Sequence, residues 1–138
     1  KALELYHQAG ELSYAAAYFN IGNAYRKGKG VERDEKKADH YYELAAMGGD
    51  GMARHNLGYS EYKKSNWDRA LKHWMISAGS GYNRSVKMIK QIYMDGHAKK
   101  EDYEDALRCY QNCIEEIRSE QRDIAAAYQD SYKCIQNS

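Results

Sequence analysis

A repeat of about 36 residues is the feature that most constrains the fold of this chain. Four similar runs begin with the alanines Ala2, Ala38, Ala70 and Ala106, at spacings of 36, 32 and 36 residues. In each run an aromatic residue stands four positions after the alanine, and a small residue stands seven positions after it. Because offsets of four and seven share one face of an α-helix, each run predicts one helix with a single buried face.

A second series of small residues lies between these runs and predicts a partner helix for each unit. Each small residue is followed four positions later by Ile or Leu, in the pairs Ala17 and Ile21, Ala53 and Leu57, and Ser85 and Ile89. The unit is therefore two antiparallel helices, which we term A (small residue, then Ile or Leu) and B (alanine, then aromatic). A helix pair in about 36 residues is the length of an α-solenoid repeat.

These patterns predict an all-α protein with about eight helices in a single solenoid domain. The 138 residues contain no proline, which agrees with a mostly helical chain because proline breaks helix interiors. We expect helices near residues 1–12, 15–27, 35–47, 52–64, 67–79, 83–95, 103–118 and 121–136. The corresponding division is helix B of a preceding repeat (1–13), three repeats (14–49, 50–81 and 82–118) and a C-terminal capping helix (119–138).

The stretch "GKGVERDEKKA" has the glycines and lysine of a phosphate-binding loop, and two interpretations compete. A phosphate-binding loop would need a strand before it and a GKS or GKT ending, and neither is present. The structural interpretation makes Gly28 and Gly30 the turn after helix A, and Asp34 the N-cap of helix B. Gly96 and Asp102 repeat this layout in the third unit, whereas the shortened second unit offers Asn66 as the cap.

The residues of the first unit resemble the Sel-1-like repeat. The pattern A-x-x-x-L-G-x-x-Y-x-x-G-x-G-V-x-x-D-x-x-K-A-x-x-Y-Y-x-x-A-A is met by Ala17, Ile21, Gly22, Tyr25, Gly28, Gly30, Val31, Asp34, Lys37, Ala38, Tyr41, Tyr42, Ala45 and Ala46. The second unit keeps Ala53, Leu57, Gly58, Ala70, Trp74 and Ala78, and the third keeps Ile89, Tyr93, Gly96, Asp102 and Ala106 but departs at Lys90. The resemblance implies a right-handed superhelix that acts as an adaptor for other proteins, with small-ligand binding in a few members.

The repeat also assigns a face that points away from the core. We expect Ala17, Ile21, Ala24 and Tyr25 to form the core face of the first A helix, and Gly22 and Gly58 to lie where A helices approach each other. The opposite face of the three A helices carries Phe19, Asn23, Arg26, His55, Tyr59, Tyr62, Lys87, Gln91 and Met94. Aromatic residues, Met and Arg are enriched at protein interfaces, although isolated exposed apolar residues are also ordinary. This face therefore predicts a concave groove that binds a peptide or protein.

Other functional classes receive less support from the sequence. The 21 basic and 20 acidic residues give no strong positive field for nucleic acid, and no apolar run is long enough for a membrane helix. No nucleophile motif is present, so we expect no enzyme and no cofactor. We interpret Cys109 and Cys113, one helical turn apart, as core residues rather than metal ligands. The odd total of three cysteines favours a cytoplasmic or other reducing compartment.

Three functions remain in competition. The first is a non-catalytic adaptor that grips a partner in the A-helix groove. The second is a structural subunit embedded in a larger assembly, which predicts apolar exposure outside the groove. The third is a small-ligand or hydrolase-like site in the groove. The C-terminal run "IAAAY", with Tyr132 and Ile135, is either a cap on the stack or a helix that exchanges with another chain.

Overall fold

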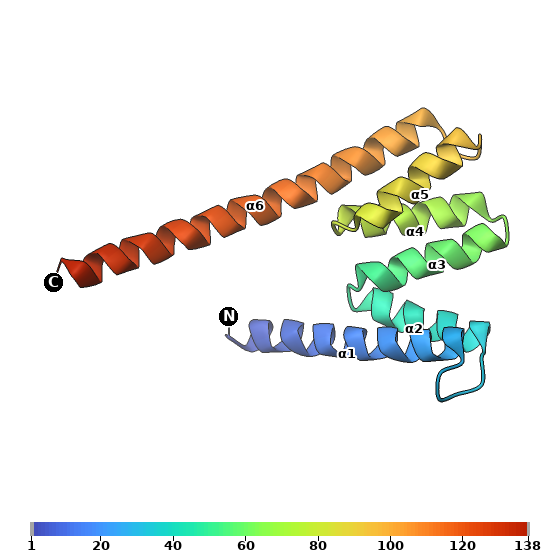
Figure 1. Cartoon of the computed structure of the whole chain (residues 1–138), viewed down its shortest axis with the longest axis horizontal. Coiled ribbons are helices and arrows are strands. Elements are labelled where there is room, and N and C mark those ends of the chain that lie inside the picture. Colours follow the sequence, from blue (N-terminus) through green and yellow to red (C-terminus); the bar gives the residue numbers. More distant parts are fainter. Residues whose placement is uncertain (1, 138) are drawn as a thin grey trace.

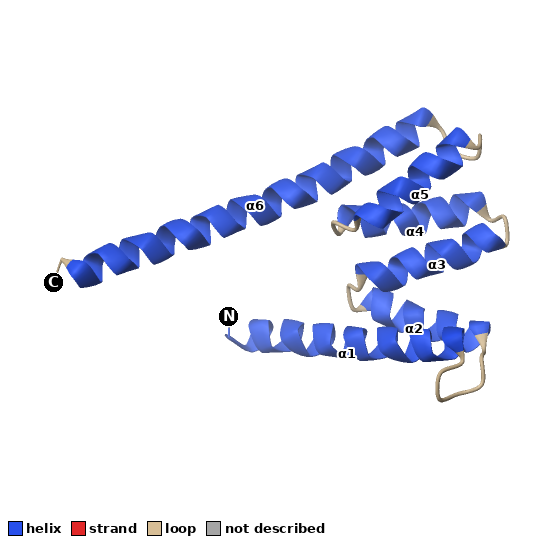
Figure 2. Ribbon diagram, viewed as in Figure 1, coloured by secondary structure: helices blue, strands red, loops and turns tan. Residues whose placement is uncertain are grey.

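The computed structural model describes residues 2–137, and their side chains from residue 14 onward. These residues form six helices joined by short turns, with no strand among them (Figures 1 and 2). The helices are α1 (Ala2–Lys27), α2 (Glu35–Met47), α3 (Gly51–Lys63), α4 (Trp67–Gly79), α5 (Asn83–Met94) and α6 (Lys100–Gln136). The all-α prediction is confirmed.

The expected number of about eight helices is wrong, because two expected breaks are absent. The expected helices 1–12 and 15–27 are the single helix α1, and 103–118 and 121–136 are the single helix α6. The turns from α2 to α3 and from α4 to α5 each contain a glycine with positive φ, Gly49 or Gly81. Residues 118–121 (RSEQ) contain no glycine or proline, and a lone glycine such as Gly10 is tolerated inside a helix. A change of repeat register therefore does not by itself end a helix.

Consecutive helices run antiparallel and stack in chain order (Figure 1). The pairs α1–α2 and α3–α4 are the most closely packed, and they correspond to A and B helices of the first two repeats. The B-helix face is confirmed on α2 and α4, where Ala38 and Ala70 are buried together with Tyr42 and Trp74. On α6 Ala106 is buried but Tyr110 is half-buried, and the run from Ala2 lies outside the described side chains. Two core clusters result, one around α1–α3 and one around α4, α5 and the start of α6.

The predicted core face of α1 is partly wrong. Ala17 is exposed and Ile21 is 38% exposed, whereas Ala15 and Gly22 are buried and Phe19 packs on the core. The equivalent residues Ala53 and Leu57 of α3 are buried in the cluster that includes α2. Residues 2–13, which the repeat pattern assigned to a preceding B helix, instead continue α1 in the same direction and do not fold back onto it. Within the described residues, Ala17 and Ile21 are therefore uncovered.

Gly22 and Gly58 lie at close helix approaches, but between A and B helices of one repeat rather than between A helices. A Cβ atom at Gly22 would lie 2.7 Å from the ring of Tyr42, and one at Gly58 would lie 2.5 Å from Nε1 of Trp74. Each aromatic ring of a B helix therefore fits against the bare backbone of the A helix before it. Close packing of this kind leaves no room for a side chain at either glycine.

The contacts of the loop after α1 are those of a turn that connects two helices. Gly28 and Gly30 have φ of +70° and +75°, and the backbone N–H of Gly28 donates to the carbonyl of Ala24 at 2.8 Å. Asp34 is the N-cap of α2, since its Oδ1 accepts from the backbone N–H of Lys37 at 3.1 Å. Each contact ends or starts a helix, as the structural interpretation requires.

The other two predicted caps differ from Asp34. Asn66 holds the N-cap position of α4 but its side chain donates to Glu61 at 2.7 Å and does not cap the helix. Helix α6 begins earlier than expected, so Asp102 lies in its first turn and accepts from the backbone N–H of Lys99 at 3.0 Å. Asp50, which the repeat pattern did not single out, caps α3 by accepting from Ala53 at 2.9 Å.

We expect Asp34→Ala to lower the free energy of unfolding by about 0.5–2 kcal/mol, because the substitution leaves a helix N–H without its acceptor. Urea denaturation followed by circular dichroism measures the change. Glu32→Ala, which removes an exposed carboxylate from the same loop, is the control and should leave the stability unchanged. Equal stability of the Asp34 and Glu32 variants would contradict the capping role.

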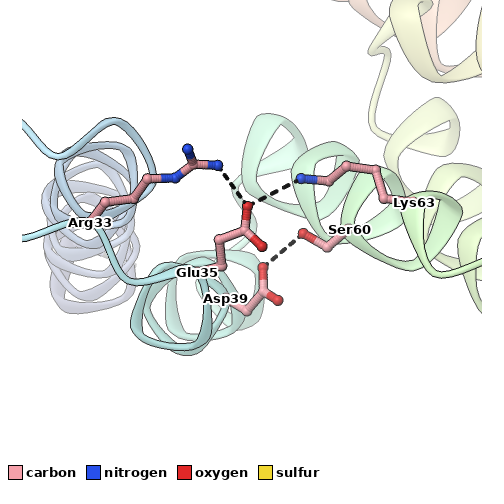
Figure 3. Close-up of polar contacts among 5 residues, drawn as sticks. All are labelled: Arg33, Glu35, Asp39, Ser60 and Lys63. Atoms are coloured by element: carbon pink, nitrogen blue, oxygen red, sulfur yellow. Dashed lines mark hydrogen bonds and ion pairs between the residues drawn. The ribbon is translucent and has the colours of Figure 1, made fainter.

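Polar contacts link the first repeat to the second on the outer surface (Figure 3). Glu35 of α2 lies between Arg33, at 3.0 Å, and Lys63 of α3, at 3.6 Å. The hydrogen bond from Arg33, followed by the charge of Lys63, lowers the pKa of Glu35. Ser60 of α3 donates to Asp39 of α2 at 2.8 Å. Arg33, Glu35 and Lys63 are largely exposed, so their ion pairs contribute little to the free energy of folding.

The second half of α6 does not cap the stack. Residues 119–137 are exposed, and this half of the helix extends away from the other helices (Figure 1). Its apolar side chains Ile117, Ile124, Tyr128 and Ile135 recur at spacings that keep them on one helical face. The expected capping contact is therefore wrong for the described residues.

The expected burial of both cysteines on α6 is also wrong. Cys109 is exposed and Cys113 is half-buried. Cys134 lies on the same helix, 21 residues beyond Cys113, which corresponds to a rise of roughly 30 Å. It therefore cannot approach the other two thiols within the chain.

Candidate protein-binding groove

A hollow of about 630 Å³ opens along the A helices, and we refer to it as the groove. Its lining residues are Phe19, Asn23, Arg26 and Lys27 of α1, Met52, His55, Asn56 and Tyr59 of α3, Tyr82 at the N-cap of α5, and Arg84 and Met88 of α5. The groove thus draws on all three repeats and on no B helix. Helix B residues pack the core behind it, which holds the three A helices at fixed separations.

The structure brings together Phe19, Asn23, Arg26, His55 and Tyr59 from the predicted set. The other four predicted residues lie elsewhere. Tyr62 packs on Trp67 and Trp74 with ring centroids 5.4 and 5.8 Å apart, and Lys87, Gln91 and Met94 are exposed outside the groove. Whether the five grouped residues bind a partner stays a prediction.

The misplaced residues have one physical cause. On α1 the groove is lined by the expected positions, but on α3 and α5 the lining moves about one turn toward the helix N-terminus. Met52 and Arg84 therefore enter the lining, while Tyr62 and Met94 leave it. Each repeat of a solenoid is rotated slightly against its neighbour, so a groove crosses successive helices obliquely. A fixed repeat register could not anticipate Met52, Tyr82, Arg84 and Met88.

Two of the α1 residues that line the groove, Phe19 and Asn23, also contact the core. The hydroxyl of Tyr42 donates to Oδ1 of Asn23 at 2.6 Å, and the rings of Phe19 and Tyr42 have centroids 5.9 Å apart. Phe19 therefore does not lie on a face wholly opposite the core, as the repeat pattern suggested. Its half-buried ring forms the wall between the core and the groove.

His55 forms a buried polar contact at the base of the groove. It is 6% exposed, and its Nδ1 lies 2.8 Å from Oγ of Ser85 on α5. Burial, together with the positive charges of Arg84 and Arg26, lowers the pKa of His55 to about 4. The imidazole is thus neutral at neutral pH, and its hydrogen bond joins the second A helix to the third.

The Ser85–His55 pair has the residue types of a nucleophile and a base, but its position does not suit catalysis. Ser85 is fully buried, so its hydroxyl cannot reach a substrate in the groove. Among the described side chains no carboxylate lines the groove, so none of them there orients the imidazole as the Asp of a catalytic triad does. The geometry favours a helix-to-helix structural bond.

Tyr59 lies at the centre of the groove between two cationic side chains. The guanidinium carbon of Arg26 and the ammonium nitrogen of Lys63 each lie 5.4 Å from the centre of its ring. Its ring also stacks on Tyr62 at a centroid distance of 5.9 Å, and it packs against the second core cluster. Tyr59 therefore presents a fixed aromatic edge flanked by positive charge.

Among the described side chains, no group of three or more His, Cys, Asp or Glu could hold a metal ion. None of the six helices combines the length and the apolar character that crossing a bilayer would require.

Comparison with known proteins identifies the repeat. The family model described as "Sel1 repeat" matches residues 1–14, 15–50 and 91–112, which together make up more than half of the chain. Over 75 residues the chain is 36% identical to a sel1-like repeat-containing protein, L21, of Acanthamoeba polyphaga mimivirus. That match covers 54% of this chain and 14% of the viral protein.

Two solved structures share the fold. A Sel1 repeat protein from Oxalobacter formigenes superposes with a TM-score of 0.58 at 30% identity, covering 74% of this chain and 44% of that one. The protein c5321, described as a protective antigen of uropathogenic Escherichia coli strains displaying an SLR fold, gives a TM-score of 0.60 at 26% identity. That match covers 83% of this chain and 26% of c5321. The chain therefore spans under half the length of each of these three proteins.

Proposed function

Because the chain belongs to the Sel1 repeat family, we propose that it is a non-catalytic module that binds a peptide or protein surface in the groove of α1, α3 and α5. Proteins built from this repeat are generally protein-interaction modules, and they are typically non-catalytic. The groove is the part of the chain that we propose for this role. Its three A helices present one surface that a single extended ligand could contact throughout.

The composition of the groove is the observation that carries the proposal. Phe19, Tyr59 and Tyr82 line it together with Arg26 and Arg84. Tyrosine and arginine supply much of the binding energy in protein interfaces, because each combines a large contact area with hydrogen bonding. The rings of Phe19 and Tyr59 are partly fixed by the core, so they lose little conformational freedom on binding.

The test compares two neighbouring tyrosines. We expect Tyr59→Ala to weaken partner binding by more than about 1 kcal/mol, because truncation removes a central aromatic contact of the groove. The partner is identified by co-purification and mass spectrometry, and its affinity is measured by isothermal titration calorimetry. Tyr62→Ala is the matched control, since Tyr62 packs on the same core cluster but does not line the groove.

Lys72→Ala, on the exposed side of α4, is a second control and should alter neither binding nor stability. Equal binding by the Tyr59 and Tyr62 variants, with similar losses of stability, would make both residues packing residues only. The groove assignment would then fail.

A second candidate function is a structural subunit of a larger assembly. The observation in its favour is the exposed apolar stripe on α6, formed by Ile117, Ile124, Tyr128, Tyr132 and Ile135. This stripe lies outside the groove, where the embedded-subunit alternative predicts apolar exposure. Ile124→Glu would weaken the assembly in that case and would leave binding in the groove unchanged.

A further inference from the structure

We propose that the groove selects an acidic peptide segment, and that Arg26 and Arg84 hold one of its carboxylate groups. The proposal rests on the proposed function, since it names the kind of partner that the same groove takes. It follows from the charge of the lining, the free donors of the two arginines and the apolar residues beside them.

The lining has an excess of positive charge that the whole chain does not share. Arg26, Lys27 and Arg84 line the groove, and among the side chains that the structure describes no Asp or Glu lines it. The chain as a whole carries a formal charge of only +1. The positive charge is therefore local, and it favours a ligand with a few negative charges at this point.

The two guanidinium groups are held by aromatic residues rather than by acids. Arg26 lies over the ring of Tyr59, and Nη1 of Arg84 lies 3.4 Å from the hydroxyl oxygen of Tyr82. Over the described part of the chain, neither arginine forms an ion pair. Arg26 also forms a hydrogen bond with the hydroxyl of Tyr42. Since a guanidinium has five N–H donors, each arginine still has donors available to an incoming oxygen acceptor.

Both arginines border the same hollow as His55, Arg26 from α1 and Arg84 from α5. After burial, which is the largest cause, their positive charges also lower the pKa of His55. The neutral imidazole supplies no compensating charge. A carboxylate between the arginines would gain charge-assisted hydrogen bonds, which a planar guanidinium donates in pairs.

The apolar part of the lining indicates what lies beside the carboxylate. Phe19, Met52 and Met88 line the same hollow, one from each A helix. Met side chains adapt to irregular apolar partners, so they can accept more than one kind of side chain. The favoured segment therefore places an acidic residue next to an apolar one.

A peptide fits this charge better than a nucleic acid does. Polynucleotide binding depends on neutralising a run of phosphates, each by a separate basic side chain. The groove offers three cations on a chain whose basic and acidic residues are nearly balanced. It can therefore pair with one or two carboxylates but not with a continuous phosphate backbone.

The experiment uses two pools of fluorescein-labelled octapeptides with amidated C-termini. One pool has two fixed glutamates at the centre, the other has two fixed glutamines, and both have mixed Leu, Met and Phe at the flanking positions. Fluorescence anisotropy with the purified chain gives the affinity for each pool. We expect the glutamate pool to bind about tenfold more tightly, and this difference to shrink as salt is raised.

The variants Arg26→Gln and Arg84→Gln should each reduce the affinity for the glutamate pool by about tenfold and leave the glutamine pool unchanged. Arg118→Gln is the matched control, because it removes an exposed arginine from α6, outside the groove. Circular dichroism confirms that each variant is folded. A third pool, with glutamines at the centre and a free C-terminus, tests whether a terminal carboxylate serves as well as a side-chain one.

The possible failures are distinguishable. Suppose that both pools bind equally, that Tyr59→Ala weakens the binding of both, and that the arginine variants change neither. The groove then binds peptides without selecting acidic ones, and only this proposal is overturned. If Tyr59→Ala has no effect on any pool, the proposed function fails as well. Displacement of the glutamate pool by an equal concentration of a single-stranded oligonucleotide, at physiological salt, would replace the peptide with a nucleic acid as the preferred ligand.

Discussion

Trp74→Ala should lower the free energy of unfolding by about 3–5 kcal/mol, the largest loss that we expect from any single truncation. Trp74 is fully buried in the second core cluster, and its Nε1–H donates to the backbone carbonyl of His55 at 3.1 Å. Truncation would leave a large cavity between α3 and α4 and a buried carbonyl without its donor. Urea denaturation followed by circular dichroism measures the loss.

Ile76→Ala on the same helix is the control for the Trp74 substitution. Ile76 is more than half exposed, so its truncation should alter stability by no more than about 0.5 kcal/mol. The Trp74 site also predicts a coupling with Gly58. Gly58→Ala should destabilise the natural chain, and should cost less in the Trp74→Ala background, where the ring that opposes the new Cβ atom is gone. Equal stability losses for the Trp74 and Ile76 variants would contradict the assigned core.

Acidification from about pH 7.5 to about pH 5 should remove about 2 kcal/mol of stability through His55 alone. Burial, then Arg84 and Arg26, lower the pKa of His55 to about 4 in the folded chain, against an ordinary value of 6.5. Between these two pH values the unfolded state binds a proton that the folded state does not. Stability is therefore full above the unfolded pKa and falls as the pH drops toward the folded pKa.

The His55 contribution is isolated by substitution. His55→Gln keeps a hydrogen-bonding group near Ser85 but does not titrate, so its stability should change by about 2 kcal/mol less over the same pH interval. Burial also lowers the pKa of His73, which adds a smaller effect of the same sign in both proteins. His40→Gln, at an exposed position on α2, is the control. If the stability of the His55 and His40 variants depends on pH as that of the natural chain does, the assignment of His55 as a buried neutral imidazole is wrong.

The sequence determined what depends on local spacing. The alanines and aromatic residues identified the buried faces of α2 and α4, because residues four and seven apart share a face whatever the surrounding structure. Gly28 and Asp34 identified the end of α1 and the start of α2, because a left-handed turn and an N-cap are local requirements of the backbone. The Sel1 repeat was recognisable for the same reason.

Only the tertiary structure decided what depends on how the repeats sit against each other. The rotation of each repeat moved the groove by one helical turn, which brought in Met52 and Arg84 and left out Tyr62 and Met94. Residues 2–13 continue α1 and do not fold back onto it, so Ala17 and Ile21 are uncovered within the described residues, although the same positions on α3 are buried. Spacing along the chain specifies the face of one helix, but the angle between helices depends on packing across the whole stack. The position of Arg26 and Arg84 on one groove, which carries the proposed preference for an acidic partner, follows from that angle.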